Sequence, residues 1–366
     1  MPHMSSRRVY LHVGTPKSGT SYLQDKLTLN RDALERQGLD YPRTRTGNHF
    51  EAALYLIGDT WAGEEKAARG RWDGLAQDAR RSQHDVLISH EILAAADAEG
   101  VARAMASFPE QEVHVVLTAR DLGRQIPAEW QERIKHRGGR DYATFLKALS
   151  RNYGRTDWMM WFWRVQHLPH VLSTWGASLP PNRVHLVTVP PSGGPRDALW
   201  KRFARVVGLD PEASYAQSDT TNASIGGAEV TMLRRLNDAL REQEVPRPVY
   251  VNWVRESIVK EVLAQRPDKV PATVPPKRRA AVEQITAAWL EEIRASGVDV
   301  VGDLADLDPV WPEDEGHWPD PDRADPEAVA EAAIEALAHV LTRVGRHPVS
   351  EEDSGPVARL TRMLRS

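Results

Sequence analysis

Short apolar runs alternate with longer amphipathic stretches through the first half of the chain. The runs have the length and β-branched content of buried strands, and the longer stretches have the period of helices. This alternation is typical of an α/β fold with a parallel sheet. Strands are predicted at residues 9–13, 85–89, 113–119 and 183–189. Helices are predicted at residues 21–37, 72–81, 98–107, 122–135, 143–149, 157–168 and 197–207.

The second half has a mostly helical pattern, with helices predicted at residues 228–242, 253–264 and 276–296. A stretch rich in proline and acidic residues follows and predicts a linker. The chain is therefore predicted to have an α/β domain over 7–306, a linker over 307–326, and a helix with a basic tail over 327–366. We expect the apolar residues of that helix to share one face. They are Ala330, Ala333, Ile334, Leu337, Val340, Leu341 and Val344.

Composition narrows the class of protein. The 366 residues are 41% hydrophobic and 27% charged, which is typical of a globular chain with a sizeable core. The net charge of −4 argues against a general nucleic-acid binder. The chain has no cysteine, which excludes disulfides and thiolate chemistry. No apolar run is long enough for a membrane span and no signal peptide is evident, so we expect a cytoplasmic protein.

The most informative segment is Gly-Thr-Pro-Lys-Ser-Gly-Thr-Ser at residues 14–21, between a predicted strand and a predicted helix. Gly14 and Gly19 have the spacing of a P-loop, in which backbone N–H groups and a helix N-terminus hold phosphate. The usual loop places its lysine directly after the second glycine, where this chain has Thr20. The lysine is Lys17, inside the loop. In that position it is expected near the bridging oxygen of a group carried on a 5′-phosphate.

This string resembles the 5′-phosphosulfate loop of sulfotransferases that use 3′-phosphoadenosine 5′-phosphosulfate (PAPS), including bacterial members. The family form is P-K-[ST]-G-T-[ST], followed by an aromatic residue and Leu-Gln, as at Tyr22 and the next two residues. The resemblance implies a three-layer α/β/α fold with a parallel sheet of about five strands. It implies that Lys17 stabilises the leaving bridging oxygen and that no metal is required. The implied 5′-phosphate ligands are Ser18, Gly19, Thr20 and Ser21.

His90 and Glu91 follow the predicted strand 85–89, at the sheet edge where α/β proteins bind ligands. Sulfuryl transfer to a hydroxyl needs a base, and either side chain is suitable. The family places a catalytic His or Glu at this point of the chain order. We expect His90 to be the base, by analogy with small-molecule sulfotransferases, with Glu91 as the other candidate. The alternative is a helix N-terminal pair with no catalytic role.

Arg120 follows the predicted strand 113–119. The family has an Arg at this strand end and a Ser on the next helix, and both grip the 3′-phosphate of the nucleotide. Arg120 suits bidentate phosphate binding. The position of the Ser holds Ala128, so Arg124 or Gln131 is a candidate substitute. For Arg124 the alternative is a solvated helix face.

Asn222 and Ser224 lie in the polar segment 220–226. Bacterial members carry a similar Asn-x-Ser segment, and the family uses this region to close over the nucleotide. The resemblance therefore implies that both residues bind the cofactor. The alternative is a turn that caps the next helix.

The resemblance therefore implies a PAPS-dependent sulfotransferase that acts on a hydroxyl or amine of a small-molecule or carbohydrate acceptor, as a monomer or homodimer. A P-loop kinase or NTPase, and a catalytically inactive nucleotide-binding protein on the same fold, are the alternatives. His12, on the strand before the loop, is expected to be a buried, hydrogen-bonded residue.

Overall fold

The computed structural model describes residues 7–58, 68–155, 160–195, 197–218, 224–312 and 318–346. Its contacts divide the chain into two compact units. The first comprises residues 1–129, 144–222 and 273–318, and the second comprises 130–143, 223–272 and 319–366. The predicted domain boundaries were based on composition and divide the chain into consecutive segments. The two units are based on contacts, and each combines segments that are far apart in sequence.

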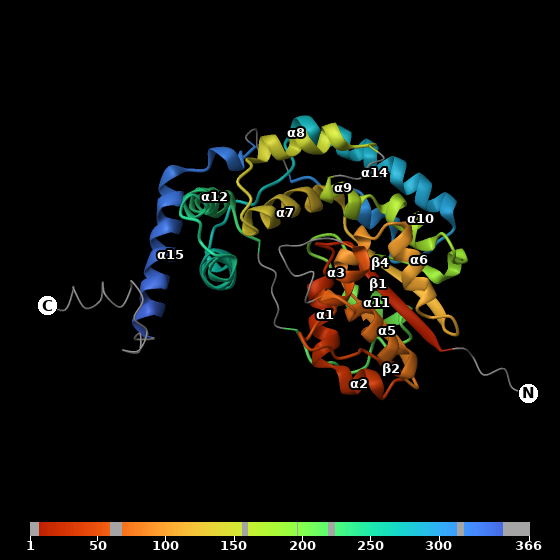
Figure 1. Ribbon diagram of the computed structural model, residues 1–366. Helices are drawn as coiled ribbons and strands as arrows, with labels where there is room; N and C mark the ends of the chain where they lie inside the picture. The colour runs from red at the N-terminus through yellow and green to blue at the C-terminus, as the bar shows by residue number, and fades with distance from the viewer. Residues whose placement is uncertain are drawn as a thin grey trace, which may run out of the picture. The chain divides into compact units, whose positions relative to one another are not determined.

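A sheet of six parallel strands forms the centre of the first unit (Figure 1). The order across the sheet is β2-β3-β1-β4-β5-β6. The strands are β1 (Arg8–Gly14), β2 (Leu39–Asp40), β3 (Asp85–Ser89), β4 (Glu112–Ala119), β5 (Val184–Thr188) and β6 (Asp299–Val301). The α/β class and the parallel sheet are confirmed. The two strands that the sequence did not predict, β2 and β6, are too short to carry a hydrophobic pattern.

The register of the sheet brings three strand ends together. His12 of β1 pairs with Ser89, the last residue of β3. Gly14, the last residue of β1, pairs with Leu117 near the end of β4. Because parallel strands end at the same edge, the segments that follow β1, β3 and β4 begin side by side.

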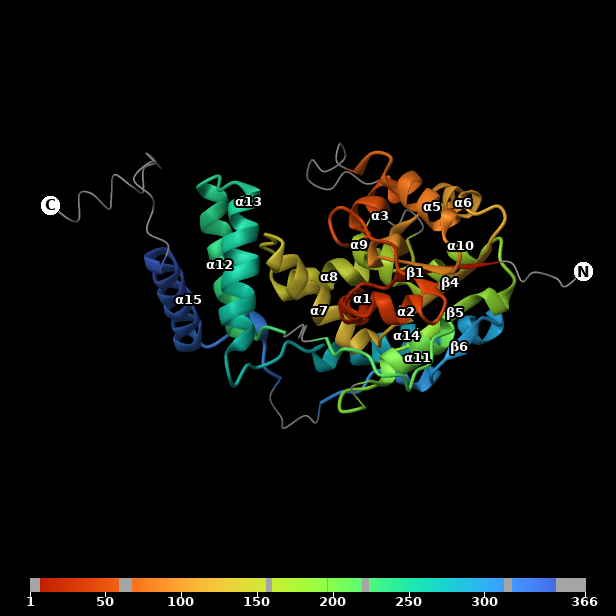
Figure 2. The ribbon, with the colours of Figure 1, turned by 90° about the horizontal axis from the view of Figure 1, so that it is seen from below.

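Helices cover both faces of the sheet (Figures 1 and 2). On one face, a buried cluster joins Tyr10, Leu87 and Val116 of the sheet to Leu23 and Phe203 of the helices. The helices of this face are α1 (Thr20–Leu29), α2 (Arg31–Glu35) and α11 (Ala198–Val206). The other layer contains α3 (Phe50–Ile57), α5 (Arg71–Arg81), η1 (Glu91–Ala95), α6 (Ala98–Ala106) and α10 (Leu168–Gly176), of which α10 packs on β4 and β5. The three-layer arrangement is thus present.

The remaining elements of this unit are α9 (Trp161–Gln166), α14 (Pro276–Ser296), and the short 3₁₀ turns η2 (Pro181–Arg183) and η5 (Leu304–Leu307). Helices α7 (Leu122–Lys135) and α8 (Tyr142–Asn152) contribute residues to both units. None of the described helices combines the length and apolar character needed to cross a membrane.

Two predicted helices are interrupted. The helix expected over 21–37 is divided at Asn30, whose side chain donates to the carbonyl of Lys26 at 2.8 Å and ends α1. The helix expected over 157–168 is divided at His167. Pro169 lies in the first turn of α10, where its missing N–H costs nothing, but it could not continue the preceding helix. The start of that predicted helix, including Trp158, lies outside the described residues.

The second unit is helical. It contains α12 (Gly227–Glu242), α13 (Arg247–Val249), the π-helix η3 (Tyr250–Val262), η4 (Leu263–Gln265), η6 (Pro321–Arg323) and α15 (Pro326–Arg346). Helix α15 packs on α12 and η3. The long helices α12 and α15 are labelled in Figure 2.

The buried side of α15 is not the apolar face that the sequence predicts. Ile334, Leu337 and Leu341 are 66%, 59% and 62% exposed. Val329 and the small residues Ala332 and Ala336 are buried instead. Close packing on α12 and η3 favours the small side chains of Ala332 and Ala336, so the larger residues of the predicted apolar face lie on the exposed side.

Candidate active site

The loop after β1 has the backbone of an anion-binding turn. Gly14, Lys17 and Gly19 have φ angles of +110°, +64° and +84°, in or near the left-handed region. Gly19 is the N-cap of α1, with no side-chain cap, and the helix begins at Thr20. The first N–H groups of a helix have no intrahelical acceptor and carry the positive end of its dipole. The loop therefore presents backbone donors where the sequence predicts phosphate.

Ser18 fastens this loop to β4. Its side chain is fully buried, and its hydroxyl donates to the carbonyl of Thr15 at 2.6 Å. The same hydroxyl lies 2.6 Å from Oγ1 of Thr118, and the Thr15 N–H donates to the carbonyl of Thr118 at 2.6 Å. The Ser18 side chain therefore has protein partners that fix the loop's shape.

His12 links three strands below the loop. Its Nδ1 lies 2.7 Å from the hydroxyl of Ser89, and its Nε2 lies 3.2 Å from that of Thr118. The ring is fully buried, and burial lowers its pKa to about 4. His12 is thus a neutral, hydrogen-bonded histidine of the core, as the sequence predicts.

His90 lies beside the loop, and its ring has little freedom to act as a base. The His90 N–H donates to the carbonyl of His12 at 3.1 Å, and only 7% of the residue is exposed. Burial lowers the pKa of the imidazole, so the ring is neutral at pH 7. Its Nδ1 accepts the N–H of Ile92 at 3.3 Å. A neutral ring that accepts at Nδ1 carries its proton on Nε2, which is then a donor.

Unlike the neutral ring of His90, the side chain of Glu91 carries a charge at pH 7 and can accept a proton. Its Oε2 accepts from Nε2 of Gln24 on α1 at 2.9 Å and lies 3.9 Å from Nδ1 of His90. Burial alone would raise the pKa of Glu91. The electrostatic interaction with His90 and the hydrogen bonds from the Glu91 backbone and Gln24 outweigh burial and lower the pKa overall. The side chain is therefore a carboxylate at pH 7, and it is 24% exposed.

The backbone of Glu91 packs directly on Gly14. A Cβ atom at Gly14 would lie 2.8 Å from the carbonyl oxygen of Glu91, closer than real contacts allow. Only glycine permits this approach, and the φ of +110° favours glycine as well. The start of the loop and Glu91 are therefore neighbours through main-chain contact.

Arg120 follows β4 and is held in a fixed position. Its Nε and Nη2 donate to Oε1 of Gln125 at 3.1 and 2.8 Å, and Nη2 also donates to the carbonyl of Arg124 at 3.0 Å. Burial and then the charge of Arg124 lower the pKa of Arg120 to about 10, against the opposing effect of Asp121. The guanidinium is still charged at pH 7.

Arg124 belongs to α7 and lies close to Arg120. Its side chain is only partly exposed, so it is not on a solvated helix face. Its Nε forms an ion pair with Asp121, and its Nη1 donates to the carbonyl of Pro190 at 3.1 Å. Its Nη2 is buried and has no hydrogen-bond partner among the described residues. Two neighbouring guanidinium groups repel each other, and an anion placed between them would relieve that repulsion.

The structure gives less information about Gln131, Asn222 and Ser224, the other predicted nucleotide ligands. Ala128 is half-buried on α7, and Gln131 donates to the carbonyl of Ile225 at 2.8 Å in the second unit. Ser224 is exposed and belongs to the second unit, and Asn222 lies outside the described residues. The roles predicted for Asn222 and Ser224 remain predictions.

Three glutamines at the site were missed in the sequence. Gln24 contacts Glu91, and Gln125 and Gln166 both contact the carbonyl of Pro16. Neutral amides have no charge or metal-ligand spacing that would single them out. Gln24 belongs to the family string, but its contact with Glu91 is evident only in the folded chain.

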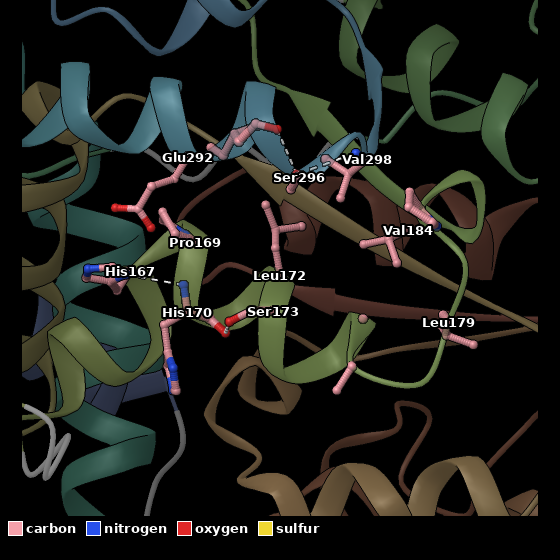
Figure 3. Close-up of a pocket in the computed structure, with 14 residues that line it drawn as sticks. His167, Pro169, His170, Leu172, Ser173, Leu179, Val184, Glu292, Ser296 and Val298 are labelled. Carbon is pink, nitrogen blue, oxygen red and sulfur yellow. Dashed lines mark hydrogen bonds between the residues drawn. The ribbon is translucent and has the colours of Figure 1, made fainter.

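A separate cavity of about 410 Å³ lies between α10 and α14 (Figure 3). His167, His170, Leu172 and Glu292 line it, together with Val184, the first residue of β5. In Figure 3 the N–H of His170 is bonded to the ring of His167, at 3.3 Å. The cavity is thus at the amino end of β5, whereas the candidate site is at the carboxyl edge of the sheet.

Two solved structures similar to this chain are sulfotransferases. The sulfotransferase from Alicyclobacillus acidocaldarius is matched over 67% of this chain and 99% of its own, with 13% identity and a TM-score of 0.41. The sulfotransferase domain from the curacin biosynthetic pathway is matched over 77% of this chain and 97% of its own, with 9% identity and a TM-score of 0.34. No protein-family model and no curated protein matches the chain. The function proposed below rests on this chain's own residues.

Proposed function

We propose that this chain is a sulfotransferase that moves the sulfuryl group of PAPS to a hydroxyl or amine acceptor. The observation that carries the proposal is the meeting of three groups at the ends of neighbouring strands. These are the loop with Lys17 after β1, the Glu91 carboxylate after β3, and the Arg120–Arg124 pair after β4. The loop could hold a phosphosulfate, the carboxylate could take the proton of the acceptor, and the arginine pair could bind a second phosphate.

On the donor side, the loop would hold the 5′-phosphate. Backbone N–H groups from Ser18 to Ser21, and the hydroxyls of Thr20 and Ser21, are the proposed ligands. Lys17 would stabilise the negative charge that develops on the bridging oxygen. The second phosphate of the nucleotide would bind Arg120 and Arg124, whose positive charges and buried Nη2 donor suit an anion.

On the acceptor side, Glu91 replaces His90 as the preferred base. The acceptor oxygen attacks sulfur, its proton passes to the Glu91 carboxylate, and the bond from sulfur to the bridging oxygen breaks. The electron pair of that bond remains on the 5′-phosphate as adenosine 3′,5′-bisphosphate leaves. His90, with its proton on Nε2, would act as a hydrogen-bond donor to the acceptor or the sulfuryl group.

The test is calorimetric binding of adenosine 3′,5′-bisphosphate compared with ADP–Mg²⁺. The proposal expects the bisphosphate to bind more tightly, and Arg120→Ala to remove most of that preference, about tenfold or more for a charged contact. Arg81→Ala is the matched control, because the side chain of Arg81 is 69% exposed. Tighter binding of ADP–Mg²⁺ would overturn the proposal in favour of a P-loop kinase or NTPase.

Transfer itself is tested with PAPS labelled in the sulfuryl group and a panel of small-molecule and carbohydrate acceptors. The proposal expects a labelled product that the Glu91→Gln protein does not form. The panel is extended with cell extract. If the protein binds the bisphosphate tightly but transfers no label to any of these acceptors, it is a catalytically inactive nucleotide-binding protein. We also propose that the reaction takes place in the cytoplasm and that it requires no metal ion.

A further inference from the structure

A single buried side chain lies between the two proposed phosphate sites. Gln125, in the first turns of α7, is 1% exposed. Its Oε1 accepts both Nε and Nη2 of Arg120, at 3.1 and 2.8 Å. Its Nε2 donates to the carbonyl of Pro16 at 2.8 Å and to Oε1 of Gln166 at 2.9 Å. Both ends of the amide are therefore used, one on each site.

The chemistry of the partners fixes the orientation of this amide. A guanidinium only donates, so the Gln125 oxygen must face Arg120. A carbonyl only accepts, so the Gln125 NH₂ group must face Pro16. A flipped amide would lose these contacts and oppose like groups on both sides.

The carbonyl that Gln125 holds belongs to the peptide bond between Pro16 and Lys17. Its direction sets the turn that carries Lys17, whose backbone has a φ of +64°. Gln166, at the end of α9, donates to the same carbonyl at 2.9 Å and is 2% exposed. Gln166 thus contacts the loop and the amide nitrogen of Gln125, whereas Gln125 contacts both the loop and Arg120.

We propose that Gln125 is a positioning residue that couples the Lys17 loop to Arg120, so that the site selects nucleotides carrying both a 5′-group and a 3′-phosphate. This inference rests on the proposed function. A 3′-phosphate bound to Arg120 stabilises the contacts of Arg120 with Gln125, and Gln125 in turn holds the Pro16–Lys17 peptide. The favoured ligand class is an adenosine 3′,5′-bisphosphate or its 5′-phosphosulfate rather than a nucleotide with a 5′-group alone.

The experiment compares the dissociation constants of adenosine 3′,5′-bisphosphate and AMP, by calorimetry, in the wild type, four single variants and a double variant. The ratio of the two constants measures the contribution of the 3′-phosphate. Arg120→Ala is expected to lower the ratio about tenfold or more and to leave AMP binding unchanged. Gln166→Met is expected to weaken both ligands equally and to leave the ratio unchanged. Gln125→Met is expected to weaken AMP binding and also to lower the ratio.

Gln125→Glu separates the two contacts of the residue. A carboxylate still accepts from Arg120 but cannot donate to the carbonyl of Pro16. This variant is expected to weaken AMP as Gln166→Met does. Its added negative charge beside Arg120 opposes a 3′-phosphate by itself, so only its AMP binding is compared. The double variant Arg120→Ala, Gln125→Met is expected to have the ratio of Arg120→Ala alone, since Gln125 acts on the 3′-phosphate only through Arg120.

Two outcomes overturn the inference while the proposed function stands. One is a Gln125→Met protein that weakens AMP but keeps the ratio. The other is a Gln125→Met protein that lowers the ratio but leaves AMP binding unchanged. A wild-type protein that binds the bisphosphate no better than AMP overturns the proposed function and this inference together. If Gln125→Met does not fold, as thermal unfolding would reveal, Gln125→Glu decides the loop contact, and AMP binding that is unchanged from wild type in this variant overturns the inference.

Discussion

Lys17 has a backbone conformation that lysine rarely adopts, with a φ of +64°. Such a conformation costs on the order of 1 kcal/mol outside glycine and persists where surrounding contacts impose it. Here the imposing contacts are the amides on the Pro16 carbonyl before Lys17 and the buried Ser18 hydroxyl after it. These contacts within the protein therefore fix the shape of the loop.

Replacing Lys17 should affect the chemical step. Lys17→Ala is expected to lower kcat for sulfuryl transfer by about 10²–10³-fold, the effect of losing one donor to a developing negative charge. Lys277→Ala, at an exposed lysine of α14, is the control. Steady-state kinetics with PAPS would measure the change. An unchanged kcat would remove Lys17 from the proposed mechanism.

The two candidate bases should differ in mutants and in pH dependence. The pKa of Glu91 is lowered from its ordinary value, so its carboxylate is present at pH 7 and is lost only in the acid range. We expect kcat/KM to change little between pH 7 and 6, and Glu91→Gln to lower it by about 10²–10⁴-fold.

His90→Asn is the matched variant, because the Asn oxygen can accept the N–H of Ile92 as Nδ1 does. It should retain the pH profile with a smaller loss of rate. An acid limb in the wild-type profile that disappears in His90→Asn would instead identify His90 as the base.

At the scale of elements, the site depends on how closely the turn after β3 approaches β1. The Cβ distance of 2.8 Å at Gly14 involves the Glu91 carbonyl, and backbone cannot move aside as a side chain can. The site is therefore sensitive to a single methyl group at this position.

Gly14→Ala is expected to destabilise the protein by about 1–3 kcal/mol more than Gly38→Ala. Gly38 has a positive φ of +81° but nothing within 4 Å of its Cβ position, so its substitution measures the backbone strain. Urea unfolding of the two variants gives the comparison. Equal losses in the two variants would show that the Glu91 contact has no energetic weight.

The elements best predicted from sequence are those whose buried residues form a continuous run or a full helical period. The five buried residues from Tyr10 to Gly14 and the pattern of β4 identify those strands. β2 and β6 have two and three residues and exist only because neighbouring strands supply their hydrogen bonds. The loop could be predicted because its two glycines and its lysine lie within one short run of consecutive residues.

The contacts of the site were not predictable in the same way. Gln125 meets Pro16 across 109 positions of sequence, and Gln24 meets Glu91 across 67. The choice between His90 and Glu91 depends on burial and on the N–H of Ile92, which motif spacing does not record. Such pairings follow from sheet register, which the sequence leaves open until the strands are assembled.

At the scale of the whole molecule, buried neutral histidines link folding to pH. Burial lowers the pKa of both His12 and His49 to about 4. Unfolding restores a pKa near 6.5, so the unfolded chain binds more protons between those values. The stability that each residue contributes is complete above about pH 6.5 and is lost as pH falls toward 4.

We expect the free energy of unfolding to decrease by roughly 3 kcal/mol for each of these histidines between pH 6.5 and 4. Denaturant titrations at several pH values measure this slope. His12→Asn keeps an acceptor and a donor near Ser89 and Thr118 but cannot take up the proton, so its slope should be shallower. A slope unchanged in His12→Asn would show that other groups dominate the acid sensitivity.

The contact between Gly14 and Glu91 also separates two kinds of sequence change. The spacing between the start of the donor loop and the proposed base is set by main chain, with no side-chain rotamer in between. Substitutions that reshape an acceptor pocket elsewhere can therefore accumulate without altering that spacing. Under the proposed function, a chain built this way can change the acceptor that it sulfates while keeping the geometry of the reaction.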